Sequence, residues 1–272
     1  MRSLLDGVCD DCRPYLASWL TSDSEESSAR IQLFPRVRDM PYYEKRGLKT
    51  RAWARHVLTH ERGTCTPKHT VLGCMYSLLG FDVRYLFYPM RWAAQQLDYP
   101  QHLLELARAL PECNHENIQI RVEGKWVIVD ATYDLPLARI GAHVTPTWDG
   151  IANCAVAVDC ENVVVHDSFE QRTRYLVESK SSWTSADVDQ YDRFCAGVNE
   201  WFTFRERGCP ESLIRPGLDL VVRPQFGIPP DRGDSLGFRG STRDAESNQR
   251  CATEIPENPE SVADRGTVSA GP

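Results

Sequence analysis

Residues 63–69 read Gly63-Thr64-Cys65-Thr66-Pro67-Lys68-His69, and the apolar run Val71-Leu72-Gly73-Cys74-Met75-Tyr76-Ser77-Leu78-Leu79 follows. This pattern predicts a tight turn that places Cys65 on the first turn of a buried helix ending near residue 79. Thr64 is in position to act as the N-cap, and Pro67 is tolerated in a first turn, where N–H groups have no partner within the helix. The positive dipole end of a helix stabilises a thiolate, so Cys65 is a candidate nucleophile. The alternative is a buried cysteine that opens an ordinary core helix.

The composition is that of an acidic globular protein. Of the 272 residues, 42% are hydrophobic and 25% are charged, the net charge is −7 and the pI is about 5.6. This charge does not favour nucleic acid or an anionic membrane as a partner. No stretch approaches the roughly 18 apolar residues of a membrane span, and Asp6 interrupts the N-terminus before a signal-peptide apolar region could form. We therefore expect a cytoplasmic protein in which most of the ten scattered cysteines are reduced thiols.

Composition also divides the chain into three parts. Residues 1–30 combine a short helix with a polar run that begins at Thr21, and we expect an N-terminal extension and linker there. Residues 31–225 carry the periodic apolar patterns of a folded domain. Pro, Gly, Ser, Asp and Arg dominate residues 226–272, so this tail is expected to be disordered.

Within the central part, periodicity predicts a mixture of helices and strands. Residues 31–43 are rich in proline and β-forming residues and are expected to run extended. Helices are predicted at residues 48–61, 102–110 and 186–205, a strand at 81–88, and a strand pair at 151–158 and 163–165.

A hairpin is predicted at residues 116–130, where two alternating runs are joined by Glu123-Gly124. A two-residue turn pairs Val122 with Lys125, so Asp130 faces Asn117. His115 then lies one diagonal step away on the same side of the ribbon, at about 7–8 Å between backbones. The opposite side is apolar and is expected to face the core; it carries Ile118, Ile120, Val122, Val127, Val129 and Ala131.

Together, these elements supply what thiol acyl-transfer chemistry needs. Cys65 would attack a carbonyl carbon, His115 would act as the base or as the imidazolium of an ion pair, and Asp130 would fix the orientation of the imidazole. The backbone N–H of Cys65, on a helix first turn, is a natural donor to the oxyanion.

The turn at 63–69, His115 before an alternating strand, and Gly124-Lys125-Trp126-Val127-Ile128-Val129-Asp130-Ala131-Thr132 resemble the signature of the transglutaminase-like superfamily. The similarity covers about residues 35–205 and is greatest to small bacterial and archaeal members with no assigned substrate. It implies an α+β fold with a papain-type core, in which the nucleophile helix packs on an antiparallel sheet. It also implies Cys65 as nucleophile, His115 as base and Asp130 as orienting acid. Glu116 and Asn117 stand where many members carry an aromatic residue, so the resemblance does not define the substrate lining.

Several residues compete with this assignment. His69 shares a helix face with Cys65 and is a rival base, although a base on a facing strand presents its ring across the cleft more directly. Asp134 is a rival orienting acid if the hairpin register shifts by an even step. A zinc site could combine Cys9 and Cys12 with the i, i+4 pair His56 and His60, although this set lacks the usual close spacing.

We therefore expect a thiol enzyme that hydrolyses an amide or ester, or transfers its acyl group to an amine, through a thioester. Its partner would be a protein, a peptide or a small amide substrate, with no cofactor, metal, nucleic acid or membrane. The main alternative is a catalytically silent binding or scaffold protein on the same fold. A zinc-dependent or redox role through Cys9 and Cys12 is a third possibility.

Overall fold

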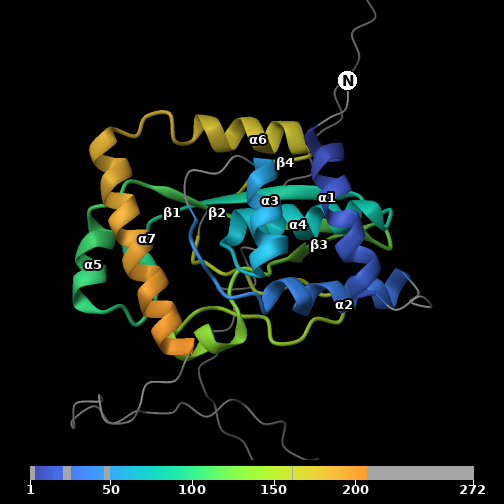
Figure 1. Ribbon diagram of the computed structural model, residues 1–272, viewed down its shortest axis with the longest axis horizontal. Helices are drawn as coiled ribbons and strands as arrows, with labels where there is room; N and C mark the ends of the chain where they lie inside the picture. Colours follow the sequence, from blue (N-terminus) through green and yellow to red (C-terminus); the bar gives the residue numbers. More distant parts are fainter. Residues whose placement is uncertain (1–3, 21–25, 46–49, 161, 207–272) are drawn as a thin grey trace, which may run out of the picture. The chain divides into compact units, whose positions relative to one another are not determined.

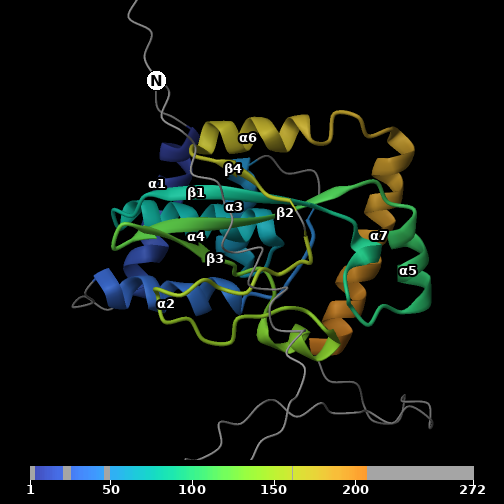
Figure 2. The same cartoon turned by 180° about the vertical axis from the view of Figure 1, so that it is seen from behind.

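The computed structural model describes residues 4–20, 26–45, 50–160 and 162–206, which form helices and one antiparallel sheet (Figures 1 and 2). The strand order is β3-β2-β1-β4. The strands are β1 (Val83–Met90), β2 (Cys113–Val122), β3 (Lys125–Val129) and β4 (Val164–His166). This mixture confirms the α+β class.

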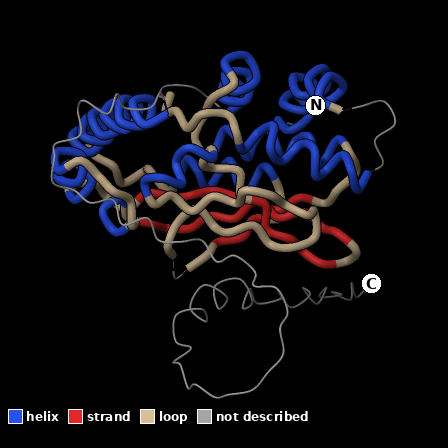
Figure 3. Tube along the Cα trace, turned by 90° about the horizontal axis from the view of Figure 1, so that it is seen from below, coloured by secondary structure: helices blue, strands red, loops and turns tan. Residues whose placement is uncertain are grey.

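Most of the helices cover one face of the sheet, and Figure 3 shows them above the layer of strands. The helices are α1 (Leu4–Trp19), α2 (Glu26–Arg38), α3 (Thr50–His60), α4 (Cys65–Leu78), α5 (Gln101–Arg108), α6 (Phe169–Glu178) and α7 (Ser185–Glu206), with short 3₁₀ helices η1 (Trp92–Ala94) and η2 (Leu135–Ile140). α5 and α7 lie side by side at one end of the sheet, and α6 runs beside β4 (Figures 1 and 2).

The predicted helix at Cys65 is the central helix, α4. It packs on the sheet, chiefly along β2, and contacts α1, α2 and α3 with its other sides. Every residue from Lys68 to Tyr76 is consequently buried, as is typical of a helix with neighbours all round. At Gly73 the helix lies close to β1, since a Cβ there would lie 3.4 Å from the Tyr85 ring, in contact with it.

The hairpin has the predicted register. Val122 pairs with Lys125 and Ile118 with Val129. Both turn residues have positive φ, 50° at Glu123 and 80° at Gly124, which is the conformation that a two-residue type I′ hairpin turn requires. The helix predictions at 48–61, 102–110 and 186–205 are confirmed by α3, α5 and α7.

The extended conformation expected for residues 31–43 is wrong, because α2 continues through Pro35 to Arg38. Leu33, Phe34 and Val37 have no exposed surface in this helix and belong to the core. Packing against α4 therefore outweighs the local preference that proline indicates.

The linker expected in residues 21–30 is also wrong where the structure describes it, since α2 begins at Glu26. The expected domain boundary after residue 30 thus falls inside a helix. The preceding helix, α1, contributes Val8 and Cys12 to the same core as α4. Residues 207–272, which include the predicted tail, lie outside the described residues.

A strand pair between residues 151–158 and 163–165 is not formed. β4 lies near the second predicted run, but it pairs with β1, with Leu86 opposite Val165. Residues 151–158 form a loop that crosses the end of β3, where the Cys154 N–H donates to the Ile128 carbonyl at 2.9 Å and the Asn153 side chain accepts from the Ile128 N–H at 2.8 Å.

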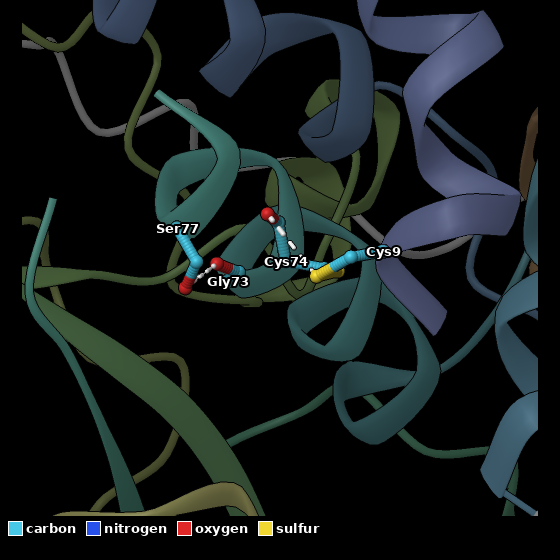
Figure 4. The surroundings of a disulfide bond; sticks show 4 residues. All are labelled: Cys9, Gly73, Cys74 and Ser77. Carbon is cyan, nitrogen blue, oxygen red and sulfur yellow. Dashed lines mark hydrogen bonds between the residues drawn. A yellow bond between two sulfur atoms is a disulfide. The ribbon is translucent and has the colours of Figure 1, made fainter. Parts of the chain in front are cut away.

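A disulfide joins Cys9 of α1 to Cys74 in the middle of α4 (Figure 4). These two cysteines depart from the expectation of reduced thiols. The other cysteines in the described ranges, which form no disulfide, are Cys12, Cys65, Cys113, Cys154, Cys160 and Cys195. In the same ranges, no helix combines the length and apolar character needed to cross a bilayer.

Candidate active site

Cys65 is the first residue of α4, as predicted. Thr64 occupies the N-cap position in an extended conformation, but its side chain makes no capping hydrogen bond, so that part of the prediction is wrong. The turn is held instead by backbone bonds from Gly63 N–H to the Pro41 carbonyl at 3.1 Å and from Tyr43 N–H to the Gly63 carbonyl at 3.3 Å. Only glycine fits at position 63, because a Cβ would lie 2.7 Å from a Val57 methyl carbon.

The structure brings His115 and Asp130 together at the open end of the hairpin. His115 Nε2 donates to Asp130 Oδ2 at 2.7 Å, and both side chains are buried. His115 and Cys65 line the same cleft, and the interaction with Cys65 contributes to the raised pKa of His115. Because Nε2 is occupied by Asp130, the other ring nitrogen, Nδ1, is the one available to the thiol.

Asp130 is fixed by further donors. Its Oδ2 accepts from the Asn117 side chain at 3.3 Å and from the Ala157 N–H at 2.9 Å, and its Oδ1 accepts from the Thr132 N–H at 3.1 Å. The loop at 151–158 thus supplies a backbone donor that the sequence did not predict. A buried carboxylate with this many donors is held in its ionised form.

The electrostatics of the pair follow from these contacts. Burial alone lowers the pKa of His115, but the charge and hydrogen bond of the adjacent Asp130 carboxylate, with a smaller contribution from Cys65, outweigh it and raise that pKa to about 10. Burial raises the pKa of Asp130, and the charge and hydrogen bond of His115 outweigh this and lower it well below its usual range. The geometry therefore favours an imidazolium–carboxylate pair at neutral pH.

The two rival residues are engaged elsewhere. His69 lies wholly inside the protein, with Nδ1 2.9 Å from the Cys65 carbonyl oxygen and Nε2 accepting from the Ala131 N–H at 2.8 Å. Both ring nitrogens are thus occupied by backbone groups. Asp134 Oδ1 accepts from the Tyr42 N–H at 3.0 Å. Neither residue is placed to replace His115 or Asp130.

A cleft of about 100 Å³ opens beside Cys65 and His115. Its walls combine aromatic, aliphatic and polar side chains, with Lys45 and Lys180 among the charged residues that line it. The aromatic lining residues are Tyr42, Trp53, Trp92, Tyr133 and Tyr191. A larger hollow of about 440 Å³ near Trp19 and Met40 contains none of Cys65, His115 and Asp130.

Two buried charged residues near the site were not predicted. Arg172 of α6 forms a two-pronged ion pair with Glu116, with Nε–Oε1 at 2.8 Å and Nη2–Oε2 at 3.1 Å, and also donates to Thr70 Oγ1 of α4. Lys68 Nζ donates to the backbone carbonyls of Arg38, Met40 and Thr132, each at 2.9 Å. Both contacts join segments distant in sequence, so no local pattern indicates them.

The proposed zinc ligands are not assembled. Cys9 is in the disulfide, and His56 and His60 stack on each other with ring centroids 4.2 Å apart. Across the described ranges, no three His, Cys, Asp or Glu side chains are grouped closely enough to hold a metal ion.

No protein-family model matches the sequence, and no curated protein matches it. Among solved structures, the chain is similar to a crystal structure of a "putative cysteine protease" from Cytophaga hutchinsonii, with a TM-score of 0.34 and 18% sequence identity. The match covers 58% of this chain and 50% of that chain, so it spans half the length of that protein. A likeness of this size carries no argument, and the function has to be argued from the site itself.

Proposed function

We propose that this protein is a cysteine-dependent enzyme that cleaves an amide or ester bond, or transfers its acyl group, through a thioester on Cys65. One observation carries the proposal: a half-buried cysteine at a helix start shares a cleft with a buried histidine that is hydrogen-bonded, at 2.7 Å, to a buried carboxylate. This combination of nucleophile, base and orienting acid is the one that thiol catalysis uses.

In the proposed reaction, the Cys65 thiolate attacks the carbonyl carbon and forms a tetrahedral intermediate. The backbone N–H of Cys65, which has no partner within the helix, donates to the oxyanion. The His115 imidazolium then gives its Nδ1 proton to the departing amine or alcohol, leaving a thioester. His115 next takes a proton from water or an amine, which attacks the thioester and releases the acyl group from the sulfur.

The cleft supports a protein, peptide or small amide as substrate. The aromatic residues in its walls offer apolar contact area for a side chain next to the reacting carbonyl. The α+β fold and the order Cys65, His115, Asp130 support the resemblance to the transglutaminase-like superfamily and its papain-type core. We propose the same assignment of roles for these three residues.

The first experiment is site-resolved iodoacetamide labelling across pH 5–9, read by mass spectrometry, on wild type and His115→Ala. Because the His115 imidazolium stabilises a thiolate beside it, Cys65 is expected to label at pH 6 at least ten-fold faster than an ordinary thiol, whose pKa is about 8.5. His115→Ala is expected to lose this advantage.

Cys160 is the matched internal control, because it is half-buried like Cys65 and lies outside the cleft lining. Equal labelling rates for Cys65 and Cys160 at pH 6 in the wild type would refute the activated thiol. The protein would then be better described as a binding protein on an enzyme-like fold.

A further inference from the structure

His69 links the residue that carries the nucleophile to the segment that carries Asp130. Its ring lies one helical turn after Cys65 and has no exposed surface. Nδ1 is 2.9 Å from the Cys65 carbonyl oxygen, and Nε2 is 2.8 Å from the backbone nitrogen of Ala131, the residue after Asp130. A single side chain thus spans α4 and the end of β3.

The partners determine where the proton is. The Ala131 N–H can only donate, so Nε2 must accept and carries no hydrogen. The Cys65 carbonyl can only accept, so Nδ1 must donate. His69 is therefore the neutral Nδ1–H tautomer. A second proton on Nε2 would point at the Ala131 N–H and break that link.

The charges around the ring are consistent with a neutral state. Burial lowers the pKa of His69 to about 3, more than the nearby Asp130 carboxylate, 3.8 Å from Nε2, can offset. Lys68 and the charged His115 ring, whose centroid is 6.4 Å away, lower the pKa further. His69 consequently keeps its two hydrogen bonds throughout the pH range in which the site would work.

We propose that His69 is a positioning residue: its neutral ring holds Cys65 at a fixed distance from the His115–Asp130 pair by tying both to one rigid link. This inference rests on the proposed function. Asp130 orients His115 from one side of the link, and Cys65 lies on the other, so a change in the link shifts the thiol relative to its base. Reactive groups misplaced by about 1 Å can lose about a hundred-fold in rate.

Three substitutions separate the link from simple packing. His69→Phe fills the space but removes both hydrogen bonds. His69→Gln places an acceptor near the position of Nε2 and can keep the Ala131 link, whereas His69→Asn reaches only the position of Nδ1. His60→Phe is the matched control, because His60 makes the same type of ring-to-carbonyl contact, with the His56 carbonyl at 3.1 Å, on the exposed side of α3.

The measurements are the pH profile of Cys65 labelling by iodoacetamide and hydrogen exchange of the Ala131 amide, with circular dichroism as the check of folding. His69→Phe is expected to lower the Cys65 rate at pH 6 by about ten- to a hundred-fold and to speed Ala131 exchange. His69→Gln should stay within about five-fold of wild type, and His60→Phe should match it. With a substrate in hand, kcat should fall in His69→Phe while KM is unchanged.

A folded His69→Phe that labels like wild type would overturn the proposal. If that variant does not fold, Gln and Asn are compared, and equal Cys65 rates for the two would overturn it as well. Failure of the proposed function has a different signature, because wild-type Cys65 then labels no faster than Cys160. In that case the Ala131 exchange still decides whether His69 forms the link, and unchanged exchange in all three variants would reject it.

Discussion

His115 and Asp130 are two ionised groups in the protein interior, and the charge of each offsets the free-energy cost of burying the other. The imidazolium donates to a carboxylate that three further donors hold in place, from Asn117, Thr132 and Ala157. A buried charge of this kind is stable only with its partner present. Breaking the pair should therefore change the unfolding free energy of the protein as well as the reactivity of Cys65.

The first prediction, at the scale of residues, concerns how the loss of unfolding free energy in Asp130→Asn depends on pH. This variant should lose about 3–5 kcal/mol of unfolding free energy near pH 6, because the buried pair is broken. The pKa of His115 is raised from 6.5 to about 10 in the folded state, so its contribution is complete below about pH 6.5 and is lost as pH rises toward 10. The pKa of Asp130 is lowered, so its contribution is lost as pH falls below about 4.

Urea unfolding of wild type and Asp130→Asn between about pH 2.5 and pH 10 measures this difference. The gap in unfolding free energy should be widest between about pH 4 and pH 6.5 and should narrow on both sides. A gap that widens from pH 7 to pH 10 would contradict the ion pair. Labelling of Cys65 in the same variant should slow, since the His115 ring loses its orienting partner.

At the scale of elements, the sequence predicts the helices and strands that a local pattern of residues indicates. The apolar run after Cys65 and the Glu123-Gly124 turn determine α4 and the hairpin, and the hairpin register placed His115 and Asp130 on one face. Ala131, which donates to His69, is 62 residues from it, and Tyr42, which donates to Asp134, is 92 residues from it, so no spacing rule predicts these contacts. The roles of these two side chains therefore required the structure.

The wrong element predictions have the same cause. The extended prediction for residues 31–43 rests on their proline and β-forming residues. The helical conformation of α2 depends instead on burial against α4, which no local pattern indicates. α6 was not predicted, yet a short-range sign exists: the Ser168 side chain accepts from the Gln171 N–H at 3.2 Å, which is the N-cap contact of a Ser-x-x-Gln pattern.

The second prediction, at the scale of elements, concerns the disulfide between α1 and α4. Cys9 and Cys74 are 65 residues apart, and a cross-link closing a loop of that length stabilises a protein by up to about 4 kcal/mol through the unfolded state. Adding dithiothreitol to the wild type should therefore lower the unfolding free energy by about 2–4 kcal/mol, measured by urea denaturation.

Cys9→Ser provides the control for that experiment. It should begin at the lower stability and show no response to the reductant, while Cys160→Ser should respond as the wild type does. An equal response of Cys9→Ser and wild type would show that another thiol is involved. Labelling of Cys65 at pH 6 should persist in Cys9→Ser, because α1 contributes no residue to the cleft lining.

At the scale of the whole molecule, the site depends on contacts that join three elements behind it. Arg172 of α6 reaches Glu116 of β2 and Thr70 of α4, and it also lies 3.3 Å from the carbonyl oxygen of Thr66, the residue after Cys65. Arg172 and Glu116 have no exposed surface. Glu116 directly follows His115 in β2, so this ion pair lies beside the proposed base.

The third prediction tests this ion pair. Arg172→Met should destabilise the protein by about 3–5 kcal/mol, because it leaves the Glu116 carboxylate buried without its charged partner. Burial already raises the pKa of Glu116 despite Arg172, so the carboxyl group should take up a proton more readily in the variant. Arg172→Met combined with Glu116→Gln should recover part of the loss, because no unpaired charge remains.

The matched control is Arg84→Met, in which loss of the partly exposed pair with Asp167, at 2.8 Å, should cost about 1 kcal/mol or less. Urea unfolding of the four proteins measures these differences, and equal losses for Arg172→Met and Arg84→Met would show that the buried pair does not hold the three elements together.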